Sequence, residues 1–378
     1  MERGRNKKSK KLIIALAIII PILLVVIGLV AFCTPLLVTY YKNAYEGRDT
    51  AERSEVYEMP ETQDELWNTD ITSEDEDSYL YELQGTSSET LPGNRFDHSI
   101  SFGDSSNAIS VYGKTPIYKV PQRDSDVFNI LVLGTDSRNV TKERGRSDSM
   151  IVMSYNKKTG KCKMVSLMRD LLVPIEGHDW NRLNAAYSYD GVGLAVNTVN
   201  QIFGLDIQHF AVIDFNGTRN FIDYLGGVDI SLTQAEANHY NGNGYLGRKD
   251  FKAGPCHMDG AMALYYMRTR YVDSDFGRTE RQRKVITTLA KKIIAEKSVE
   301  DIYELTDYAC KLVKTNIPVT TLASFFGSIA MQGENFSLES QNIPYSDAFS
   351  YKTYNGMSII SIDIDATAKR MNKFLYEE

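Results

Sequence analysis

Arginine side chains recur at two spacings within residues 265–286. Arg268 and Arg270 are two residues apart, which places both on one side of a strand or extended segment. Arg278, Arg281 and Gln282 stand at positions i, i+3 and i+4, which places them on one face of a helix. Guanidinium groups bind phosphate oxygens in pairs, and a helix N-terminus offers free N–H groups to an anion. The pattern therefore indicates a site for a phosphate or pyrophosphate.

The position of these arginines on the helix supports the same interpretation. Cations in the first turn oppose the helix dipole, because that end already carries partial positive charge. A bound anion would remove this conflict. The alternative is a basic helix face exposed to solvent, which is the interpretation we favour for Lys291 and Lys292. Two arginine groups on either side of an acidic loop, which contains Asp273 and Asp275, favour the anion site.

Two further charged pairs flank neighbouring apolar runs. Asp136 and Arg138 follow the run Val127–Leu133, and Arg146 and Asp148 lie at the start of the next one. Ligands gather at strand ends in α/β folds. Two carboxylates there can share Mg²⁺ or Mn²⁺, because such ions need one or two carboxylates plus phosphate oxygens. The alternative for Asp136 is an aspartate that caps a turn.

A third constellation joins Arg169 and Asp170, after the apolar run Lys163–Leu167, with Arg182. The alternatives are a surface ion pair between Arg169 and Asp170, or a salt bridge to the acidic N-terminal stalk. Asn184 stands where it would cap the following helix, so a structural and a functional role remain open for it. The sequence contains no Walker motif, no His-Glu-x-x-His and no Gly-x-Ser-x-Gly.

Apolar runs and helical periodicities alternate around these motifs, which predicts an α/β fold. Strands are expected at 127–133, 149–155, 163–167, 209–214, 228–232 and 359–364. Helices are expected at 183–189, 192–203, 218–225, 259–267 and 278–294. Two or three more helices are expected within 299–331, and a last helix is expected to end at Tyr376. Residues 235–255 are rich in Gly and Asn, so we expect a long loop there.

The N-terminal region predicts a membrane anchor. An apolar run, Leu12–Cys33, is long enough to span a bilayer. The residues before it are basic, which places that end in the cytoplasm. These residues are Arg3, Arg5, Lys7, Lys8, Lys10 and Lys11. We predict a cytoplasmic tail at 1–11, a transmembrane anchor at 12–33, an extracytoplasmic acidic stalk and transition at 34–125, and a folded domain at 126–378.

Charge and cysteine content narrow the function classes. The formal net charge is −7, so any anion site must be local rather than a property of the whole molecule. Aromatic and basic residues do not interleave as they do in single-strand nucleic-acid binders, so we expect no nucleic acid. Outside the apolar run there are three cysteines, Cys162, Cys256 and Cys310, with no metal-like spacing. We expect buried thiols, and no disulfide scaffold.

The motifs together resemble the LytR-CpsA-Psr family over about residues 127–295. In chain order they are Asn129-Ile-Leu-Val-Leu-Gly-Thr-Asp-Ser-Arg138, Arg146-Ser-Asp-Ser149, Val165-Ser-Leu-Met-Arg-Asp170, Arg182-Leu-Asn-Ala-Ala-Tyr187, Tyr224-Leu-Gly-Gly-Val228 and Arg268-Thr-Arg-Tyr-Val-Asp-Ser-Asp-Phe-Gly-Arg-Thr-Glu-Arg-Gln-Arg283. The last motif is the most specific. Two positions depart from the family pattern: Met168 replaces a proline, and Ser149 replaces a threonine.

The resemblance implies a three-layer α/β/α sandwich with a central mixed sheet. It implies an apolar tunnel for a polyprenyl-pyrophosphate lipid, and transfer of a linked glycopolymer, such as teichoic acid or capsular polysaccharide, to peptidoglycan. The protein would then lie in the membrane of a Gram-positive-type bacterium, with its C-terminal domain outside. Two alternatives stay open: a lipid-pyrophosphate-binding regulator that transfers nothing, and a lipid pyrophosphatase.

The resemblance also implies roles for individual residues. Asp136 and Asp148 would bind the metal, and Asp273 or Asp275 would activate the acceptor hydroxyl. Arg169 would act in catalysis as well as in binding. The residues that would surround the pyrophosphate are Arg138, Arg146, Arg169, Arg268, Arg270, Arg278, Arg281 and Gln282.

Overall fold

The computed structural model describes residues 115–136, 146–243, 249–270, 272, 274–296, 299–318, 321–322, 325 and 336–377. The predicted tail, anchor and acidic stalk lie outside these residues. Within them, no helix combines the length and the apolar character needed to cross a membrane.

A six-stranded mixed sheet forms the centre of the domain, in the order β10-β3-β2-β1-β6-β9. β1 pairs antiparallel with β2, and β2 with β3, while β1 runs parallel to β6 and β3 runs parallel to β10. The edge strand β9 is antiparallel to β6. The strands are β1 (Val127–Thr135), β2 (Ser147–Asn156), β3 (Cys162–Leu167), β6 (His209–Asp214), β9 (Val313–Thr315) and β10 (Leu338–Ile343).

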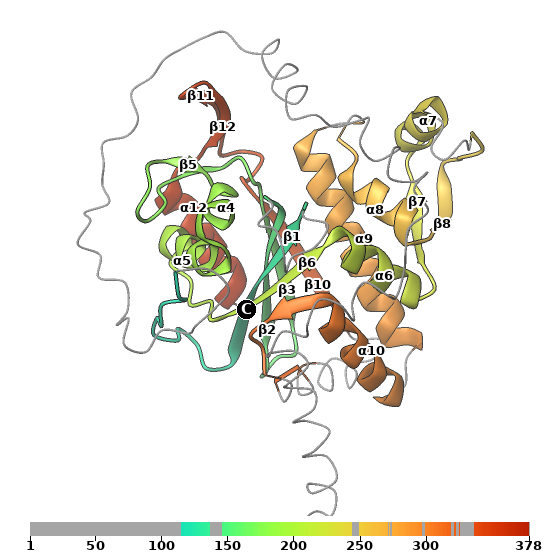
Figure 1. The fold of residues 1–378 in the computed structure, drawn as a ribbon, viewed down its shortest axis with the longest axis horizontal. Helices are drawn as coiled ribbons and strands as arrows, with labels where there is room; N and C mark the ends of the chain where they lie inside the picture. The colour runs from blue at the N-terminus through green and yellow to red at the C-terminus, as the bar shows by residue number, and fades with distance from the viewer. Residues whose placement is uncertain are drawn as a thin grey trace, which may run out of the picture.

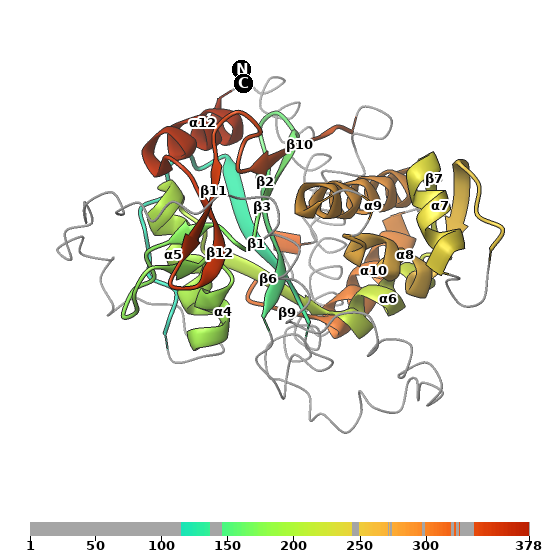
Figure 2. The same ribbon diagram turned by 90° about the horizontal axis from the view of Figure 1, so that it is seen from above.

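Helices cover both faces of this sheet (Figures 1 and 2). On one face lie α4 (Ala185–Asp190), α5 (Val192–Phe203) and α12 (Ile364–Tyr376). On the other lie α6 (Phe215–Tyr224), α8 (Gly260–Arg268), α9 (Asp275–Glu296) and α10 (Val299–Leu312). A further helix, α7 (Gln234–Asn243), packs beside α8 and α9 at the outside of this second layer. Because both faces of the sheet are covered, its central strands are apolar on both sides.

Successive side chains of β1 point to opposite faces of the sheet. Leu131 and Leu133 are fully buried in the core with α5. Val132 and Gly134 point the other way, where they line a cavity beneath α8 and α9. The period of two along a strand produces this division.

Within the described residues, three two-stranded sheets lie outside the main sheet. They are β4 (Leu172–Val173) with β5 (Asn181–Arg182), β7 (Val228–Leu232) with β8 (Gly254–Met258), and β11 (Ser350–Tyr354) with β12 (Met357–Ser361). The β12 strand also forms a bridge to the end of the Arg169–Asp170 loop, between Ile360 and Leu171.

The predicted α/β class and the mixed central sheet are confirmed. The long loop predicted at 235–255 is wrong in part, because α7 and β8 occupy much of that range. The transition before Asp126 packs on the domain from its first described residues: Ile117 is fully buried, and the Tyr118 N–H donates to Asn197 on α5 at 3.1 Å. Cys162 and Cys310 are buried thiols as expected, whereas the thiol of Cys256 is only partly buried.

Candidate functional site

Charged residues from three strand ends meet at one edge of the sheet. Asp136 directly follows β1, Asp148 is the second residue of β2, and Arg169 follows β3. Because β1, β2 and β3 are successively antiparallel, the end of β1, the start of β2 and the end of β3 share an edge. The predicted convergence of these motifs therefore follows from the topology.

The loop between β1 and β2 is closed at its base by Asp136. The Arg146 N–H donates to the Asp136 carboxylate at 2.7 Å, and the Asp136 N–H donates to the Arg146 carbonyl at 3.2 Å. This contact joins the ends of two strands across ten residues, so it differs from the capping of a local turn, which was the alternative for Asp136. It occupies one carboxylate oxygen, and no described residue forms a hydrogen bond to the other. Arg138 lies outside the described residues, and the Arg146 side chain is exposed.

Helix α9 is fixed across the same edge by side-chain contacts. The Ser149 hydroxyl on β2 donates to the Gln282 side-chain carbonyl at 3.1 Å, and the Gln282 amide donates to the Met267 carbonyl at 3.4 Å. The Thr279 hydroxyl donates to Asn342 on β10 at 2.8 Å. Gln282 thus joins the sheet to the end of α8, and the departure Ser149 keeps the hydroxyl that this contact requires.

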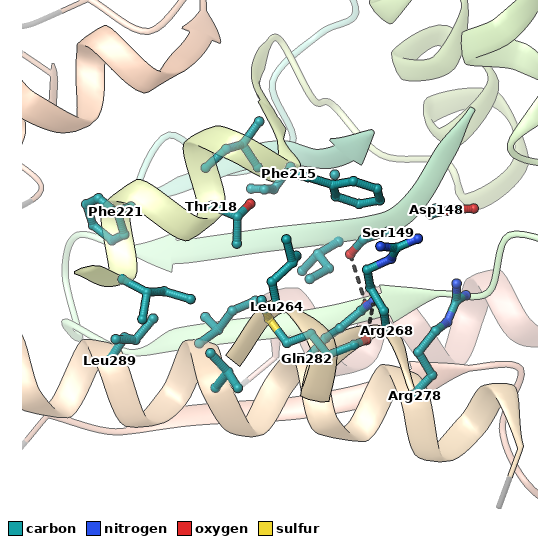
Figure 3. A pocket seen from close by; sticks show the side chains of 18 of the residues that line it. Asp148, Ser149, Phe215, Thr218, Phe221, Leu264, Arg268, Arg278, Gln282 and Leu289 are labelled. Carbon is teal, nitrogen blue, oxygen red and sulfur yellow. Dashed lines mark hydrogen bonds between the residues drawn. The ribbon is translucent and has the colours of Figure 1, made fainter. Parts of the chain in front are cut away.

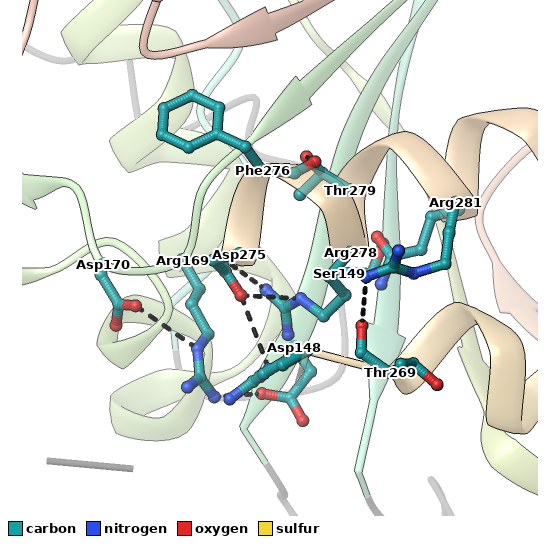
Figure 4. A network of polar contacts seen from close by, with 12 residues as sticks. Asp148, Ser149, Arg169, Asp170, Thr269, Asp275, Phe276, Arg278, Thr279 and Arg281 are labelled. Carbon is teal, nitrogen blue, oxygen red and sulfur yellow. Dashed lines mark hydrogen bonds and ion pairs between the residues drawn. The ribbon is translucent and has the colours of Figure 1, made fainter. Parts of the chain in front are cut away.

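Asp275 lies between two of the predicted pyrophosphate-binding arginines (Figure 4). Both Arg278 Nη2 and Arg278 Nε are 2.9 Å from its carboxylate, and Arg270 Nε is 3.5 Å away. Arg278 is only 2% exposed, so its charge needs a partner inside the protein. Asp275 supplies the negative charge that arginines in a first helical turn require. Asp273 lies outside the described residues.

Arg169 forms the opposite wall of the site. Its Nη1 is 2.8 Å from Asp148, and its Nε is 3.6 Å from Asp170. Arg182 Nε is 3.3 Å from the other oxygen of Asp170. The predicted alternative, a surface pair of Arg169 and Asp170, does not describe this arrangement, because both side chains are largely buried and Arg169 also reaches Asp148.

The two aspartates at the strand ends have opposite pKa shifts. Partial desolvation raises the pKa of Asp136, and the negative charge of Asp148 raises it further. Burial also works to raise the pKa of Asp148, but Arg169, Arg278 and Arg270 outweigh it and hold that pKa below its ordinary value. A divalent cation between the two carboxylates would remove their repulsion, but it would compete with Arg169 for Asp148. Among the described residues, no three His, Cys, Asp or Glu side chains come together as a metal site, so the two aspartates would be the protein's only carboxylate ligands there. The remaining ligands would have to be phosphate oxygens or water.

A cavity of about 370 Å³ extends from this charged edge between the sheet and the second helical layer (Figure 3). Its lining is overwhelmingly apolar away from the edge. The guanidinium groups of Arg268 and Arg278 lie with Asp148 at one end, and Phe221 and Leu289 lie at the other. Its lining residues are Val132, Gly134, Asp148, Ser149, Ile151, Ile213, Phe215, Thr218, Phe221, Ile222, Leu264, Met267, Arg268, Arg270, Arg278, Gln282, Val285, Ile286, Leu289, Ala290 and Ile293.

Two predicted binding residues have structural contacts of their own. Arg268 ends α8 instead of lying on an extended segment, and its guanidinium stacks 4.3 Å from the ring centre of Phe215 inside the cavity. Arg281 is 3.3 Å from Glu236 on α7 and donates to the Thr269 carbonyl at 2.8 Å. Arg281 is not among the residues that line the cavity.

The resemblance implied an apolar tunnel, but the residue patterns did not show which side chains line it or which residue pairs with Arg281. Val285, Ile286 and Leu289 lie within the helix predicted through 278–294, and they border the cavity. The Thr233–Glu236 spacing is a capping-box signal, and the Glu236 carboxylate does accept from the Thr233 N–H at 2.8 Å. That signal could have located α7, although not its contact with Arg281.

Comparison with known proteins places this site in a family. A model of the LytR_cpsA_psr family matches residues 95–374. The chain is 33% identical over 203 residues to the polyisoprenyl-teichoic acid–peptidoglycan teichoic acid transferase TagU of Enterococcus faecalis, covering 53% of this chain and 64% of that protein. It is 32% identical over 242 residues to biofilm regulatory protein A of Streptococcus mutans, covering 59% of this chain and 58% of that protein. These two matches therefore span less than two thirds of the relatives' own lengths.

Solved structures share the fold. Bacillus subtilis TagV superposes with a TM-score of 0.55 at 26% identity, covering 67% of this chain and 98% of that one. TagT bound to LIIa-WTA gives a TM-score of 0.57 at 23% identity, covering 72% and 98%. The family protein YwtF (TagT) with bound octaprenyl pyrophosphate lipid gives 0.53 at 22% identity, covering 68% and 94%. With a family match across most of its length and the same fold, this chain belongs to the LytR_cpsA_psr family.

Proposed function

We propose that this protein is a membrane-anchored phosphotransferase that attaches a polyprenyl-pyrophosphate-linked glycopolymer to peptidoglycan, with Mg²⁺ or Mn²⁺ as cofactor. The observation that carries the proposal is the shape and lining of one cavity. It is apolar along its length and has arginines at one end. A ligand that matches it has a long apolar chain and a strongly anionic head group, as a polyprenyl pyrophosphate does.

Binding of the lipid chain follows from the apolar lining. Ile286 and Ala290 on α9 and Val132 on β1 are only partly buried in the protein alone, and all three border the cavity. An apolar chain would cover these surfaces, at about 0.8 kcal/mol for each CH₂ group buried. The relatives named above include transferases of teichoic acid, and solved relatives contain an octaprenyl pyrophosphate lipid or a teichoic acid precursor.

Binding of the pyrophosphate would exchange ion-pair partners within the site. Arg270 and Arg278 both form ion pairs with Asp275. A pyrophosphate at the end of the cavity would compete with Asp275 for these guanidiniums. Asp275 would then be released from these two guanidiniums and be free to face the acceptor hydroxyl. Arg169 would contact the same phosphates from the opposite side.

Transfer requires little covalent chemistry from the protein. An acceptor sugar hydroxyl attacks the phosphorus atom that carries the polymer, the bond to the lipid phosphate breaks, and Asp275 or Asp273 takes the hydroxyl proton. The arginines stabilise the charge on the departing lipid phosphate. Asp136 and Asp148 would hold the divalent cation, which would add further positive charge beside the phosphate oxygens.

The decisive experiment detects the product. Full-length protein in detergent is incubated with Mg²⁺, a polyprenyl-pyrophosphate-linked glycopolymer fragment and peptidoglycan, and muramidase digests are examined by mass spectrometry for a phosphodiester between polymer and muropeptide. We expect this product with wild-type protein and its loss in Asp136→Ala and Asp148→Ala. Asp347→Ala, which removes an exposed partner of Arg370, is the matched control and should retain activity.

Other outcomes would identify the alternatives. Release of polymer phosphate without a linked product would indicate a lipid pyrophosphatase. Tight binding of the lipid donor with no turnover would indicate a regulator, a function that the names of two relatives mention: the Streptococcus mutans protein and regulatory protein MsrR of Staphylococcus aureus, which is 28% identical and covers 68% of this chain and 77% of its own length.

A further inference from the structure

We propose that Asp170 is a positioning residue that holds Arg169 in the orientation needed for phosphate binding, and that Arg182 anchors Asp170 to the C-terminal hairpin. The inference rests on the proposed function, because it assigns Arg169 to the same pyrophosphate. It concerns two residues, Asp170 and Arg182, for which the function proposed above has no role.

A chain of alternating charges carries the proposal. Asp148 contacts Arg169 at 2.8 Å, Arg169 contacts Asp170 at 3.6 Å, and Asp170 contacts Arg182 at 3.3 Å. Arg182 Nε also donates to the Ser358 carbonyl on β12 at 2.9 Å. The chain therefore runs from the proposed metal site to the hairpin of β11 and β12, and Figure 4 shows its first part.

The backbone around Asp170 is fixed on two sides. The Ile360 N–H of β12 donates to the Asp170 carbonyl at 2.8 Å. Leu172 pairs with Arg182 in the β4–β5 hairpin, and the Asn184 N–H donates to the Arg169 carbonyl at 3.2 Å. Met168, which stands where the family pattern has proline, is 1% exposed and donates its N–H to the Ile343 carbonyl at 2.8 Å. A loop fixed this way gives the Asp170 side chain a defined starting point.

Burial separates this arrangement from an ordinary surface pair. The side chains of Arg169, Asp170 and Arg182 are 11%, 19% and 20% exposed. The pair of Arg370 and Asp347 has a shorter contact, 2.8 Å, but its side chains are 52% and 68% exposed. Exposed pairs contribute little because water competes for both charges. Partly buried charges that share partners restrict each other's geometry far more.

The geometry of the guanidinium explains what Asp170 does. The Nε edge of Arg169 faces Asp170, and the Nη1 atom faces Asp148 and the proposed phosphate site. With the Nε edge held, the Nη groups keep one direction when a phosphate or cation replaces the Arg169–Asp148 contact. Without Asp170, the long side chain would regain rotamers that point elsewhere.

Two roles for Asp170 predict opposite effects on anion binding. If Asp170 only added negative charge near the site, its removal would make the site more positive and strengthen pyrophosphate binding. If it positions Arg169, its removal weakens binding in spite of the gain in positive charge. Arg169 Nε and Asp170 form an ion pair at 3.6 Å, not a hydrogen bond. An asparagine at this position keeps the shape of the side chain and an oxygen that faces Nε, but not the charge, so a positioning role predicts partial rescue by Asp170→Asn.

The test measures the affinity of the full-length protein in detergent for geranylgeranyl pyrophosphate, a probe that requires no turnover. We expect Asp170→Ala to bind about tenfold more weakly than wild type, Asp170→Asn to lie between the two, and Asp347→Ala to match wild type. In an Arg169→Met background, we expect Asp170→Ala to change the affinity by less than about twofold, since its effect passes through Arg169.

Equal or tighter binding by Asp170→Ala or Asp170→Asn overturns the proposal. If Asp170→Ala also weakens binding about tenfold in the Arg169→Met background, the proposal is overturned, because Asp170 would then act without Arg169. If Asp170→Ala does not fold, the same comparison is made with Asp170→Asn and Arg182→Met. This test measures binding and not transfer, so it can be carried out even if the proposed transferase activity is wrong. A wild-type protein that binds the probe but makes no linked product would contradict the transferase activity and leave the role of Asp170 to be decided by the affinities.

Discussion

Arg278 and Arg281 are three residues apart on α9, yet their guanidinium groups contact different parts of the protein. Arg278 pairs with Asp275 and lines the cavity, whereas Arg281 pairs with Glu236 on α7 and does not line the cavity. The sequence predicted that both bind pyrophosphate, because the i, i+3 spacing places them on one helix face. The spacing is correct, but long side chains can leave a shared face in different directions, and only the tertiary partner decides which.

This difference predicts that the two arginines respond differently to substitution. Arg281→Gln leaves the 4% exposed Glu236 without its guanidinium partner, and breaking a buried pair costs about 3–5 kcal/mol of unfolding free energy. Arg278→Lys keeps a positive charge near Asp275 but loses the forked contact, so it should mainly weaken pyrophosphate binding. Thermal unfolding with and without geranylgeranyl pyrophosphate separates the effects. If Arg281→Gln is as stable as wild type but no longer binds geranylgeranyl pyrophosphate, Arg281 contacts the ligand instead.

A histidine remote from the site predicts the pH dependence of stability. His209 begins β6 and lies 4.7 Å, between ring centres, from Phe128. Desolvation lowers the pKa of His209, and Asn316 offsets this only in part. The unfolded chain therefore takes up a proton below pH about 6.5 while the folded protein does not, so stability falls as pH drops through that value. In urea unfolding at pH 7.5 and 5.5, His209→Gln should show a smaller fall than wild type. Identical falls would contradict this assignment.

At the scale of elements, the cavity depends on how closely α6 and α8 approach each other. Gly260, at the start of α8, packs directly on α6: an added Cβ would lie 2.2 Å from the Arg219 carbonyl oxygen. The Gly260 N–H also donates to Asp223 on α6 at 2.6 Å. Both helices line the cavity, so a wider spacing between them would change its shape.

We therefore predict that Gly260→Ala lowers the unfolding free energy by about 1–3 kcal/mol through overpacking, and that it also weakens lipid pyrophosphate binding. The matched control is Gly242→Ala on α7, where an added Cβ meets nothing within 4 Å. Because alanine favours a helix over glycine, that variant should be neutral or up to about 1 kcal/mol more stable. Urea unfolding of both variants checks this, and equal stability of the two would show that α8 can shift without cost.

Elements with an apolar pattern were predictable, and elements built from polar residues were not. The predicted bounds of α5, β6 and β7 agree with the structure, because the apolar residues of each recur with the period of its helix or strand. β10 has the sequence Leu-Glu-Ser-Gln-Asn-Ile, and it forms a strand because β3 offers it a parallel partner at the sheet edge. α7 begins at a capping signal but has little apolar asymmetry to reveal it. Local sequence does not contain the partner that stabilises such segments.

Some features of the candidate site could likewise be predicted from the sequence, and others could not. The convergence of Asp136, Asp148 and Arg169 follows from three apolar strands in antiparallel order, so it was predictable once the strands were known. The family resemblance implied an apolar tunnel, but the residue patterns alone did not predict where it lies. A cavity is a space left between two layers, and their separation depends on contacts such as that of Gly260 with Arg219. The place of Asp275 between two arginines also needed the structure, since Asp273 was an equal candidate in the sequence.

At the scale of the whole molecule, the proposed reaction requires the cavity and a lipid-borne donor on the same side of a membrane. The basic residues before the run Leu12–Cys33 predict a cytoplasmic N-terminus, which would leave the domain outside the cell. In that topology the anchor would keep the cavity close to the outer surface, where a lipid chain could enter it directly from the bilayer.

We predict that protease added to intact protoplasts removes the folded domain and leaves a short membrane-bound fragment that carries the N-terminus. An epitope tag at each end would be followed by immunoblotting, with a cytoplasmic protein as the control for intact cells. The C-terminal tag should vanish while the N-terminal tag survives until detergent is added. If the C-terminal tag survives in intact protoplasts and disappears only after lysis, the domain is cytoplasmic. It would then be separated from peptidoglycan by the membrane, and the transfer reaction could not be its function.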